Sequence, residues 1–553
     1  MNSVSLRRCY WIRFSACSLL LSLLAFVAAG AYQRPTTYSN PVIPGDFPDP
    51  SVVRVGEEYW ATATSGGWAP HFPILRSRNL VHWEVVGAVF MKAPAWTKGD
   101  FWAPELSEDR GRFYIYYTAR RNDGPGKKGT LCVAVATATA PDAAYTDHGP
   151  LVCQDIGSID AMTLRDEKNQ RYLIWKEDGN DRKQPTPIWA QRLSEDGLKL
   201  IGKRREILRN NSAWEGHVVE GSFILRHGDW FYHFYSGNAC CGRGCNYALG
   251  VARSRKLLGD WERNPGNPIL AANETWQCPG HGSIVTTPDG RAFMLYHSYR
   301  RRVDTFNVGR EALLDEIKWN SDGWPIINNG KGPSNVAASP VEVMQVNQTA
   351  FMAEFLSTGD DGWQWPMYSR QNSRTEDGFL RLEVGATANA DNWTGAVFAR
   401  RTTSGDYVAT TSIDLGTLPQ RTRAGLAAFS WRNWAVGIAV GEGKLFVWRR
   451  EGDKEEVLAT KGTSPSRLIY LRMSVRGGEK YDFAFSNDGQ SWQELGPTVN
   501  GSYIEGARVA LTVGGPAHSV ARFDWLRIED KQSPNLTLHA HAIKFGGIYG
   551  TGE

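Results

Sequence analysis

Five stretches of the chain repeat one pattern, in which an ionisable residue begins a short apolar strand and an aromatic-rich second strand follows after a tight turn. These residues, called the pivots below, are Asp49, Glu105, Asp160, Glu220 and His281. Successive pivots lie 56, 55, 60 and 61 residues apart. A two-strand unit that recurs at a nearly constant period is the signature of a radial repeat. If the five first strands line a common axis, four carboxylates and one histidine meet in one cavity.

The repeats predict an all-β fold. Further strand candidates such as 131–138 and 247–254 bring each unit to about four strands. The 22 Trp, 22 Phe, 20 Tyr and 57 Gly suit many short strands joined by tight turns. Five such units between residues 40 and 333 predict a five-bladed β-propeller. The alternative, a β-sandwich with accidental spacing, has to explain five regular pivots.

A second domain is expected after the segment 323–340, which is rich in Gly, Asn, Ser and Pro and is typical of a linker. From 345 to 530, closely spaced strand candidates alternate with Gly-containing turns, which predicts an antiparallel β-sandwich. This domain is expected either to pack on the propeller or to bind sugar. Its tryptophans, expected to be exposed, are candidate sugar contacts: Trp363, Trp365 and Trp393.

The N-terminus has the composition of a signal peptide over residues 1–31. Three arginines precede an apolar run over 14–29, and Ala29-Gly30-Ala31 fits a cleavage site. The run is shorter than the ~20 residues that a membrane span needs. The sequence therefore predicts a secreted, extracellular protein without a membrane segment after cleavage. An uncleaved signal anchor is the alternative.

Sequons and cysteines agree with secretion. Asn-x-Ser/Thr sequons predict a glycoprotein; they begin at Asn210, Asn273, Asn347, Asn392, Asn500 and Asn535. Six cysteines follow the signal peptide: Cys132, Cys153, Cys240, Cys241, Cys245 and Cys278. An even number in an oxidising compartment indicates disulfides, with fifteen connectivities open. A zinc site is the alternative for Cys240-Cys241-x-x-x-Cys245, but a second ligand pair is missing.

The charge pattern argues against nucleic acid as a partner. The formal net charge is +4 in 553 residues, and the basic residues are scattered in short clusters. Nucleic-acid binding needs a concentrated basic patch. The basic residues are therefore interpreted as solvated surface.

The carboxylate pivots suggest acid–base chemistry. Asp49 and Asp160, each taken alone, read as ordinary loop aspartates. Glu220 lies inside an apolar run, where an unpaired charge is costly. Desolvation and neighbouring carboxylates predict a raised pKa for Glu220, as a general acid needs. Three carboxylates from different strands that meet in one cavity fit glycoside hydrolysis.

Six short motifs make the chain resemble glycoside hydrolase family 43 over about residues 40–333. In order they are Phe47-Pro48-Asp49-Pro50-Ser51, Phe101-Trp102-Ala103-Pro104-Glu105, Ser158-Ile159-Asp160, Val219-Glu220-Gly221, Gly280-His281-Gly282-Ser283 and Gly309-Arg310. The C-terminal domain resembles the concanavalin-like sandwich attached to many members. Each motif is weak alone, and their shared order carries the resemblance.

The resemblance implies a five-bladed propeller and an inverting mechanism. It implies that Asp49 is the general base that activates water and Glu220 the general acid that protonates the leaving oxygen. Asp160 would orient Glu220 and modulate its pKa. An inverting enzyme should separate the carboxyls of Asp49 and Glu220 by ~6.5–9.5 Å.

The resemblance also implies roles for three residues around the carboxylates. Trp102 and Arg310 would bind the substrate, by an apolar face and by hydrogen bonds to sugar hydroxyls. His281 would lie near the propeller axis, as a core histidine or beside a calcium ion. No cofactor is expected to be required, and a structural calcium ion is the one metal considered. Glu105 is expected to brace its blade.

The implied substrate is an oligo- or polysaccharide of the plant cell wall. Exo-acting release of α-L-arabinofuranosyl or β-D-xylosyl residues is expected. A retaining fructosyl hydrolase is one alternative, but its first-blade signature Asn-Asp-Pro-Asn-Gly is replaced here by Pro48-Asp49-Pro50-Ser51. A catalytically silent carbohydrate-binding propeller is the other.

Overall fold

The chain is almost entirely β-structure in the computed structural model, which describes residues 36–123, 129–301, 305–341, 350–355, 362–369, 371–386, 392–464 and 466–530. The predicted signal peptide, 1–31, lies outside the described residues. Within them, the α-helical structure is the four-residue α2 (Thr305–Val308). No helix in these ranges is long and apolar enough to cross a membrane.

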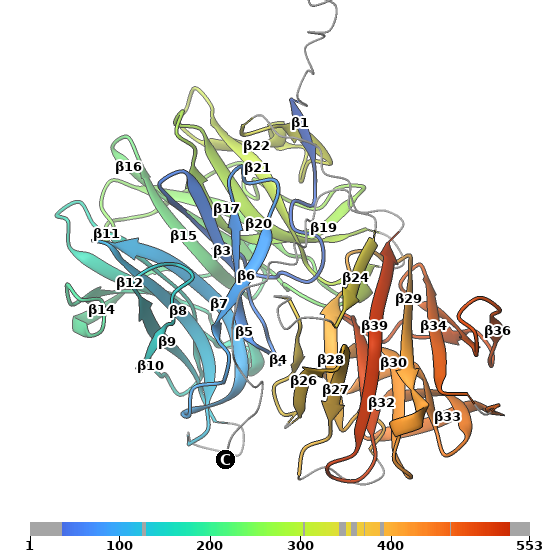
Figure 1. Ribbon diagram of the computed structural model, residues 1–553. Coiled ribbons are helices and arrows are strands. Elements are labelled where there is room, and N and C mark those ends of the chain that lie inside the picture. Colours follow the sequence, from blue (N-terminus) through green and yellow to red (C-terminus); the bar gives the residue numbers. More distant parts are fainter. Residues whose placement is uncertain are drawn as a thin grey trace, which may run out of the picture.

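Five antiparallel four-stranded sheets follow one another along the chain (Figure 1). Sheet 1 consists of β2 (Ser51–Val55), β3 (Glu58–Thr62), β5 (His71–Ser77) and β6 (Glu84–Phe90). Sheet 2 consists of β7 (Thr97–Asp109), β8 (Arg112–Arg121), β9 (Leu131–Ala138) and β10 (Thr146–Val152). Sheet 3 consists of β11 (Ser158–Arg165), β12 (Arg171–Glu177), β13 (Ile188–Leu193) and β14 (Leu200–Leu208). Sheet 4 consists of β15 (Val219–His227), β16 (Trp230–Gly237), β17 (Ala248–Ser254) and β18 (Glu262–Arg263). Sheet 5 is β19 (Trp276–Thr286), β20 (Ala292–Arg300), β21 (Glu311–Trp319), β22 (Pro325–Ile327).

The five sheets close into a ring. The first strands, β2, β7, β11, β15 and β19, each contact the next, and β19 contacts β2. A separate apolar cluster fills each of the five seams between neighbouring sheets. Near the closure, β1 (Thr37–Ser39) pairs with β23 (Val336–Ala338). The predicted five-bladed propeller is confirmed, and the sheets are its blades.

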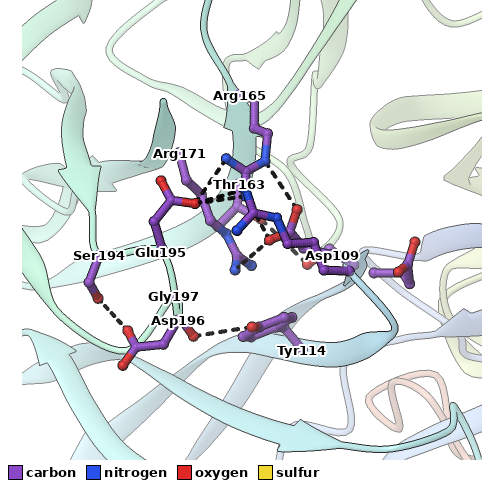
Figure 2. Close-up of polar contacts among 12 residues, drawn as sticks. Asp109, Tyr114, Thr163, Arg165, Arg171, Ser194, Glu195, Asp196 and Gly197 are labelled. Atoms are coloured by element: carbon purple, nitrogen blue, oxygen red, sulfur yellow. Dashed lines mark hydrogen bonds and ion pairs between the residues drawn. The ribbon is translucent and has the colours of Figure 1, made fainter. Parts of the chain in front are cut away.

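Ion pairs join blades 2 and 3 at the strand ends opposite the pivots (Figure 2). Arg165, at the end of β11, donates Nε and Nη2 to the two carboxylate oxygens of Asp109, at 3.1 and 2.9 Å. Buried Arg171 donates to the same carboxylate, and its guanidinium lies 4.1 Å from the centre of the Tyr114 ring. A bidentate arginine–carboxylate pair fixes both position and angle.

The C-terminal domain is a two-sheet sandwich, as predicted. One sheet has the order β26 (Asn372–Glu376), β27 (Phe379–Glu383), β39 (Val520–Asp530), β29 (Tyr407–Asp414), β34 (Leu468–Arg476), β35 (Lys480–Ser486), β36 (Gln493–Glu494), with β24 (Ala350–Glu354) on β39 and β37 (Val499–Asn500) on β35. The other has the order β28 (Ala396–Arg401), β38 (Arg508–Gly514), β30 (Arg423–Ser430), β31 (Trp434–Gly441), β32 (Lys444–Glu451), β33 (Lys454–Gly462). One large apolar cluster fills the space between the sheets.

The tryptophans expected to be exposed on the sandwich are not. Trp363 and Trp393 are buried, at 9% and 8% exposure. Trp363 stacks on Phe398, with ring centres 4.3 Å apart, and Trp393 packs against Trp448. Trp365 is half-buried in β25 (Trp365–Pro366), which pairs with β4 (Trp68–Ala69) of the propeller. The expectation was wrong because the sandwich core and the domain seam use these rings for packing.

The propeller and the sandwich lie side by side and share polar contacts (Figure 1). Arg508 of β38, almost fully buried, donates to Asp46 Oδ2 at 3.1 Å and to Gln364 Oε1 at 2.9 Å. Buried Trp68 of β4 makes an edge contact with Phe429 of β30. A buried arginine needs such pairing to offset its desolvation, so the seam is a specific interface.

All six cysteines that follow the signal peptide form disulfides, as predicted. The pairs are Cys132–Cys153, Cys240–Cys241 and Cys245–Cys278. Two of them constrain the loop between β16 and β17, next to the strand pair that carries Glu220.

Candidate active site

One backbone position in each blade sets the geometry of the site. A left-handed residue occurs in or just before every first strand: Asp49 (φ 53°), Ala103 (41°), Asp160 (55°), Gly221 (61°) and His281 (48°). In blades 2 to 5 this residue lies at a register shift of the strand pair. Bulges of this kind re-aim side chains and occur beside active sites. Asp, His and Gly tolerate this conformation better than most residues, which explains the residue types of three pivots.

The other two pivots are offset from this position. In blade 2 the left-handed residue is Ala103, and Glu105 follows two residues later. In blade 4 it is Gly221, and Glu220 precedes it. A Cβ on Gly221 would lie 3.0 Å from the imidazole of His281, so glycine permits the close approach of the two blades. The five pivots are therefore not equivalent in space.

A cavity of about 400 Å³ opens at this end of the propeller. It is lined by all six residues assigned to the site from the sequence: Asp49, Trp102, Asp160, Glu220, His281 and Arg310. The sandwich adds Trp431, Arg432 and Glu505 to the lining. Its size falls in the range of small-ligand sites, and the three carboxylates share one enclosed space.

Asp49 is held as an anion. Thr64 donates to its Oδ2 at 2.7 Å, and Arg310 donates Nη1 to its Oδ1 at 2.9 Å. Burial alone would raise the pKa of Asp49, but Arg310, and after it His281 and His297, hold that pKa well below its usual range. Burial lowers the pKa of His297 to about 4. Asp49 is therefore an ionised proton acceptor at neutral pH.

Asp160 lies across His281 from Asp49. The Nδ1 of His281 is 3.5 Å from Asp49 Oδ1 and 3.9 Å from Asp160 Oδ2. The backbone N–H of Gly221 donates to Asp160 Oδ2 at 3.1 Å, which ties Asp160 to the strand of Glu220. Burial raises the pKa of Asp160 to about 6; His281 opposes this shift and the charge of Glu220 adds to it.

Glu220 is paired with a cation that the sequence prediction missed. Lys176 donates Nζ to Glu220 Oε2 at 2.6 Å, and Tyr247 donates its hydroxyl to Oε1 at 3.0 Å. Burial, the largest single influence, would raise the pKa of Glu220, but Lys176, His281 and the Tyr247 hydrogen bond together lower it. The predicted raised pKa of Glu220 is wrong, because the opposite charge at contact and the other stabilising contacts together exceed the effect of desolvation.

One feature of the sequence points to Lys176 as a buried charge. It stands in the apolar strand Arg171–Glu177, and its side chain is fully buried, with Asp178 Oδ1 at 3.1 Å as a second partner. A lysine in such a strand needs a buried anion. The sequence gives no means of choosing that anion, because Glu220 lies 44 residues further on and in the next blade.

The two residues predicted to bind the substrate, Arg310 and Trp102, differ in the contacts that they already make. Arg310 is half-buried and its guanidinium is bonded to Asp49, so it positions the carboxylate directly. Trp102 is half-buried at the cavity wall. Their predicted contacts with sugar remain predictions.

A second, very small space of about 10 Å³ lies on the axis beneath the cavity. Its lining includes Asp49, Glu105, Asp160, His281 and three serines. Ser51 donates to Glu105 Oε2 at 2.9 Å, and burial raises the pKa of Glu105 to about 8. Glu105 is therefore neutral at pH 7 and interacts with blade 1.

This axial space does not fit a calcium cage. Calcium takes six to eight oxygen ligands, whereas the space is about the size that one water molecule needs. Within the ranges that the structure describes, no group of three or more His, Cys, Asp or Glu could hold a metal ion. The calcium ion beside His281 gains no support from these donors and stays a prediction.

The fold and the site define a hydrolase that works with carboxylates at a propeller axis. Residues 38–325 match the family described as glycosyl hydrolases family 43. Residues 354–529 match the one described as beta xylosidase C-terminal concanavalin A-like domain. The chain therefore belongs to glycoside hydrolase family 43, and the resemblance is confirmed.

Named relatives cover nearly the whole chain. Xylosidase/arabinosidase 43B of Humicola insolens is 29% identical over 503 residues, which are 84% of this chain and 90% of that protein. Non-reducing end alpha-L-arabinofuranosidase BoGH43B of Bacteroides ovatus is 25% identical over 81% of this chain and 84% of its own. The crystal structure of the GH43 protein BlXynB from Bacillus licheniformis, 26% identical, superimposes with a TM-score of 0.75 over 90% of this chain and all of its own.

Proposed function

We propose that the protein is an inverting, exo-acting glycoside hydrolase that releases terminal α-L-arabinofuranosyl or β-D-xylosyl residues from plant cell-wall polysaccharide. One observation carries this proposal. Asp49, Asp160 and Glu220 share one cavity but have different electrostatic surroundings, so that Asp49 stays ionised while the other two form a coupled pair. Carboxyl groups whose pKa values are driven apart are the mark of an assigned acid and base.

Asp49 is the proposed general base. Its carboxylate accepts the proton of a water molecule that attacks the anomeric carbon. The hydrogen bonds from Thr64 and Arg310 fix the carboxylate in the cavity. A base bound by a cation is weaker but remains ionised down to low pH. As the pH falls, other groups of the site therefore take up protons before Asp49 does, and their protonation limits the proposed reaction.

Glu220 is the proposed general acid, and it works with Asp160. The two carboxyls interact, so their protons belong to the pair and not to either residue. A sugar in the cavity excludes water from Glu220, which raises its pKa and favours the proton there. Glu220 gives this proton to the leaving oxygen as the glycosidic bond breaks. The proton that Asp49 takes up returns to solvent, and Glu220 regains one from water.

Exo action is supported by the shape of the site. Trp431 and Arg432, from the turn between β30 and β31 of the sandwich, line the cavity with the propeller residues. Trp431 lies directly over Gly67, where a Cβ would come within 2.6 Å of its ring. A pocket walled on this side suits a chain end better than the middle of a polymer. The Bacteroides ovatus relative is named for action at the non-reducing end.

The proposal is tested by following hydrolysis of xylo-oligosaccharides and arabino-oligosaccharides by NMR. The expected first product is a monosaccharide whose anomeric configuration is opposite to that of the substrate. Retention of configuration would contradict inversion, and internal cleavage products would contradict exo action. Binding without any hydrolysis would favour the silent carbohydrate-binding propeller.

We also propose that the protein is secreted. The composition of residues 1–31 supports this, and so do three disulfides, which persist in oxidising compartments. N-terminal sequencing of the protein from culture medium should begin at or near Tyr32. Recovery of the uncleaved chain from the cytosol would contradict secretion.

A further inference from the structure

Two adjacent cysteines form part of the cavity wall. Cys240 and Cys241 are bonded to each other, and both line the cavity with the three carboxylates. Cys241 is exposed and Cys240 is half-buried. A disulfide has no N–H or O–H group, and its sulfur atoms are polarizable. The pair therefore offers an apolar surface within a cavity that is rich in charge.

The loop that carries this pair is held from three sides. A second disulfide joins Cys245 to Cys278 of β19 in blade 5. The backbone N–H of Gly242 donates to the hydroxyl of Tyr299 at 3.3 Å. Arg243 donates to Glu479 at 3.1 Å and to the backbone oxygen of Ser502, both in the sandwich. Such anchoring fixes the disulfide relative to the cavity before any ligand binds, which lowers the entropy cost of binding.

The pair lies on the Glu220 side of the cavity. Glu220 is paired in register with Ser236 of β16, and the loop leaves the end of that strand. Cys240 packs against an apolar cluster that includes Tyr247, the residue whose hydroxyl donates to Glu220. A general acid stands beside the oxygen that leaves. The surface next to it therefore faces the sugar on the leaving side of the bond.

We propose that the Cys240–Cys241 disulfide is a wall of the subsite for the leaving sugar, where its sulfur atoms pack against the C–H face of the ring. This inference rests on the proposed function, because it takes Glu220 to be the acid. It adds a specificity element that acts on the leaving group and not on the sugar that is released.

The test compares two substrates that need the same acid assistance. Xylobiose or arabinobiose places a ring on the leaving side, whereas methyl β-D-xyloside or methyl α-L-arabinofuranoside has an equally poor leaving group and no ring there. In C240A/C241A, kcat/KM for the disaccharide should fall about 10-fold, the effect of a lost apolar contact. For the methyl glycoside it should stay within about twofold, since no contact is lost.

Other outcomes separate the explanations. An equal fall for both substrates would show that the pair only supports the loop and Glu220, and no fall for either would show that it does not contact the sugar; both results overturn the inference. Wild-type protein that cleaves neither substrate would instead refute the proposed function. C240S/C241S gives the same comparison if the alanine variant does not fold. C132A/C153A is the matched control, because neither of its cysteines lines the cavity. In this variant the ratio of kcat/KM for the disaccharide to kcat/KM for the methyl glycoside should equal that of the wild type.

Discussion

The ammonium of Lys176 lies 2.6 Å from Oε2 of Glu220, and both side chains are buried. Lys176 belongs to blade 3 and Glu220 to blade 4, so the proposed acid depends on a charge from its neighbour blade. The pair helps to hold the pKa of Glu220 down and favours its ionised form. The protonation of Glu220 therefore depends on a residue of another blade.

Replacement of Lys176 by methionine should shift the pH profile upward. Without the ammonium, burial is opposed only by the weaker effects of His281 and Tyr247, so the pKa of Glu220 rises and the acid remains protonated to higher pH. The descending limb of kcat/KM should move to higher pH by about one unit or more. K318M is the matched control, since Lys318 is exposed and its partner Glu316 is 3.8 Å away. An unchanged profile in K176M would show that Lys176 does not set the pKa of Glu220.

Replacement of Glu220 by alanine should separate substrates by their leaving groups. Protonation by a general acid contributes about 10²–10⁴-fold to rate, and natural glycosides need it. Hydrolysis of oligosaccharides should fall by that factor, whereas aryl glycosides with acidic phenols should be much less affected. The measurement is kcat on both substrate types. Equal activity of E220A and wild type on both would refute the assignment of Glu220.

The sequence predicts the propeller because its first strands repeat at a nearly constant spacing, but it misjudges two pivots. Glu105 and Glu220 look equivalent to Asp49 in the sequence, yet the backbone places Ala103 and Gly221 at the matching left-handed position. The spacing between pivots varies by several residues, so it cannot reveal an offset of only one or two residues. It was the order of the family motifs, not the period, that indicated the chemistry.

Long-range partners escape the sequence for a different reason. The burial of Trp363 and the pairing of Lys176 with Glu220 depend on which elements pack together, and a linear pattern does not specify this. The same limit applies to the disulfides, whose six cysteines left fifteen pairings open. Only the structure shows that two neighbours in the chain, Cys240 and Cys241, bond to each other at the cavity.

Glu105 should make stability depend on pH. Its folded pKa of about 8 lies above the ordinary glutamate value, so the folded state holds a proton that the unfolded chain has lost. The contribution of Glu105 to stability is therefore greatest below pH ~4. It falls as pH rises from about 4 to about 8, by at most about 5 kcal/mol.

Replacement of Glu105 by glutamine removes this titration. E105Q keeps the shape and an oxygen that can accept from Ser51. Urea denaturation at several pH values should show a flatter decline for E105Q than for wild type between pH 5 and 8. The same slope in both proteins would show that Glu105 is not held neutral in the fold. E316Q, at a carboxyl of β21 that does not line the axial space, serves as the control.

Arg508 should couple the sandwich to the proposed base. Arg508 donates to Asp46 Oδ2 at 3.1 Å, and Asp46 Oδ1 accepts the backbone N–H of Arg310 at 3.2 Å. Arg310 in turn donates to Asp49 at 2.9 Å. A domain that has no carboxylate among the proposed catalytic groups thus reaches Asp49 through two residues. Loss of Arg508 should loosen Arg310 and, with it, the fixed position of Asp49.

R508M should therefore lose both stability and activity. Removing one partner of a buried ion pair costs about 3–5 kcal/mol, because the other is left uncompensated. Since Asp46 is partly exposed, the loss should fall at or below the lower end, about 2–3 kcal/mol. Activity should drop even at temperatures where R508M is fully folded, with a larger effect on kcat than on KM. R527M removes an exposed arginine of β39 as the control. Stability loss with unchanged kcat would show that Arg508 holds the domains together without acting on the site.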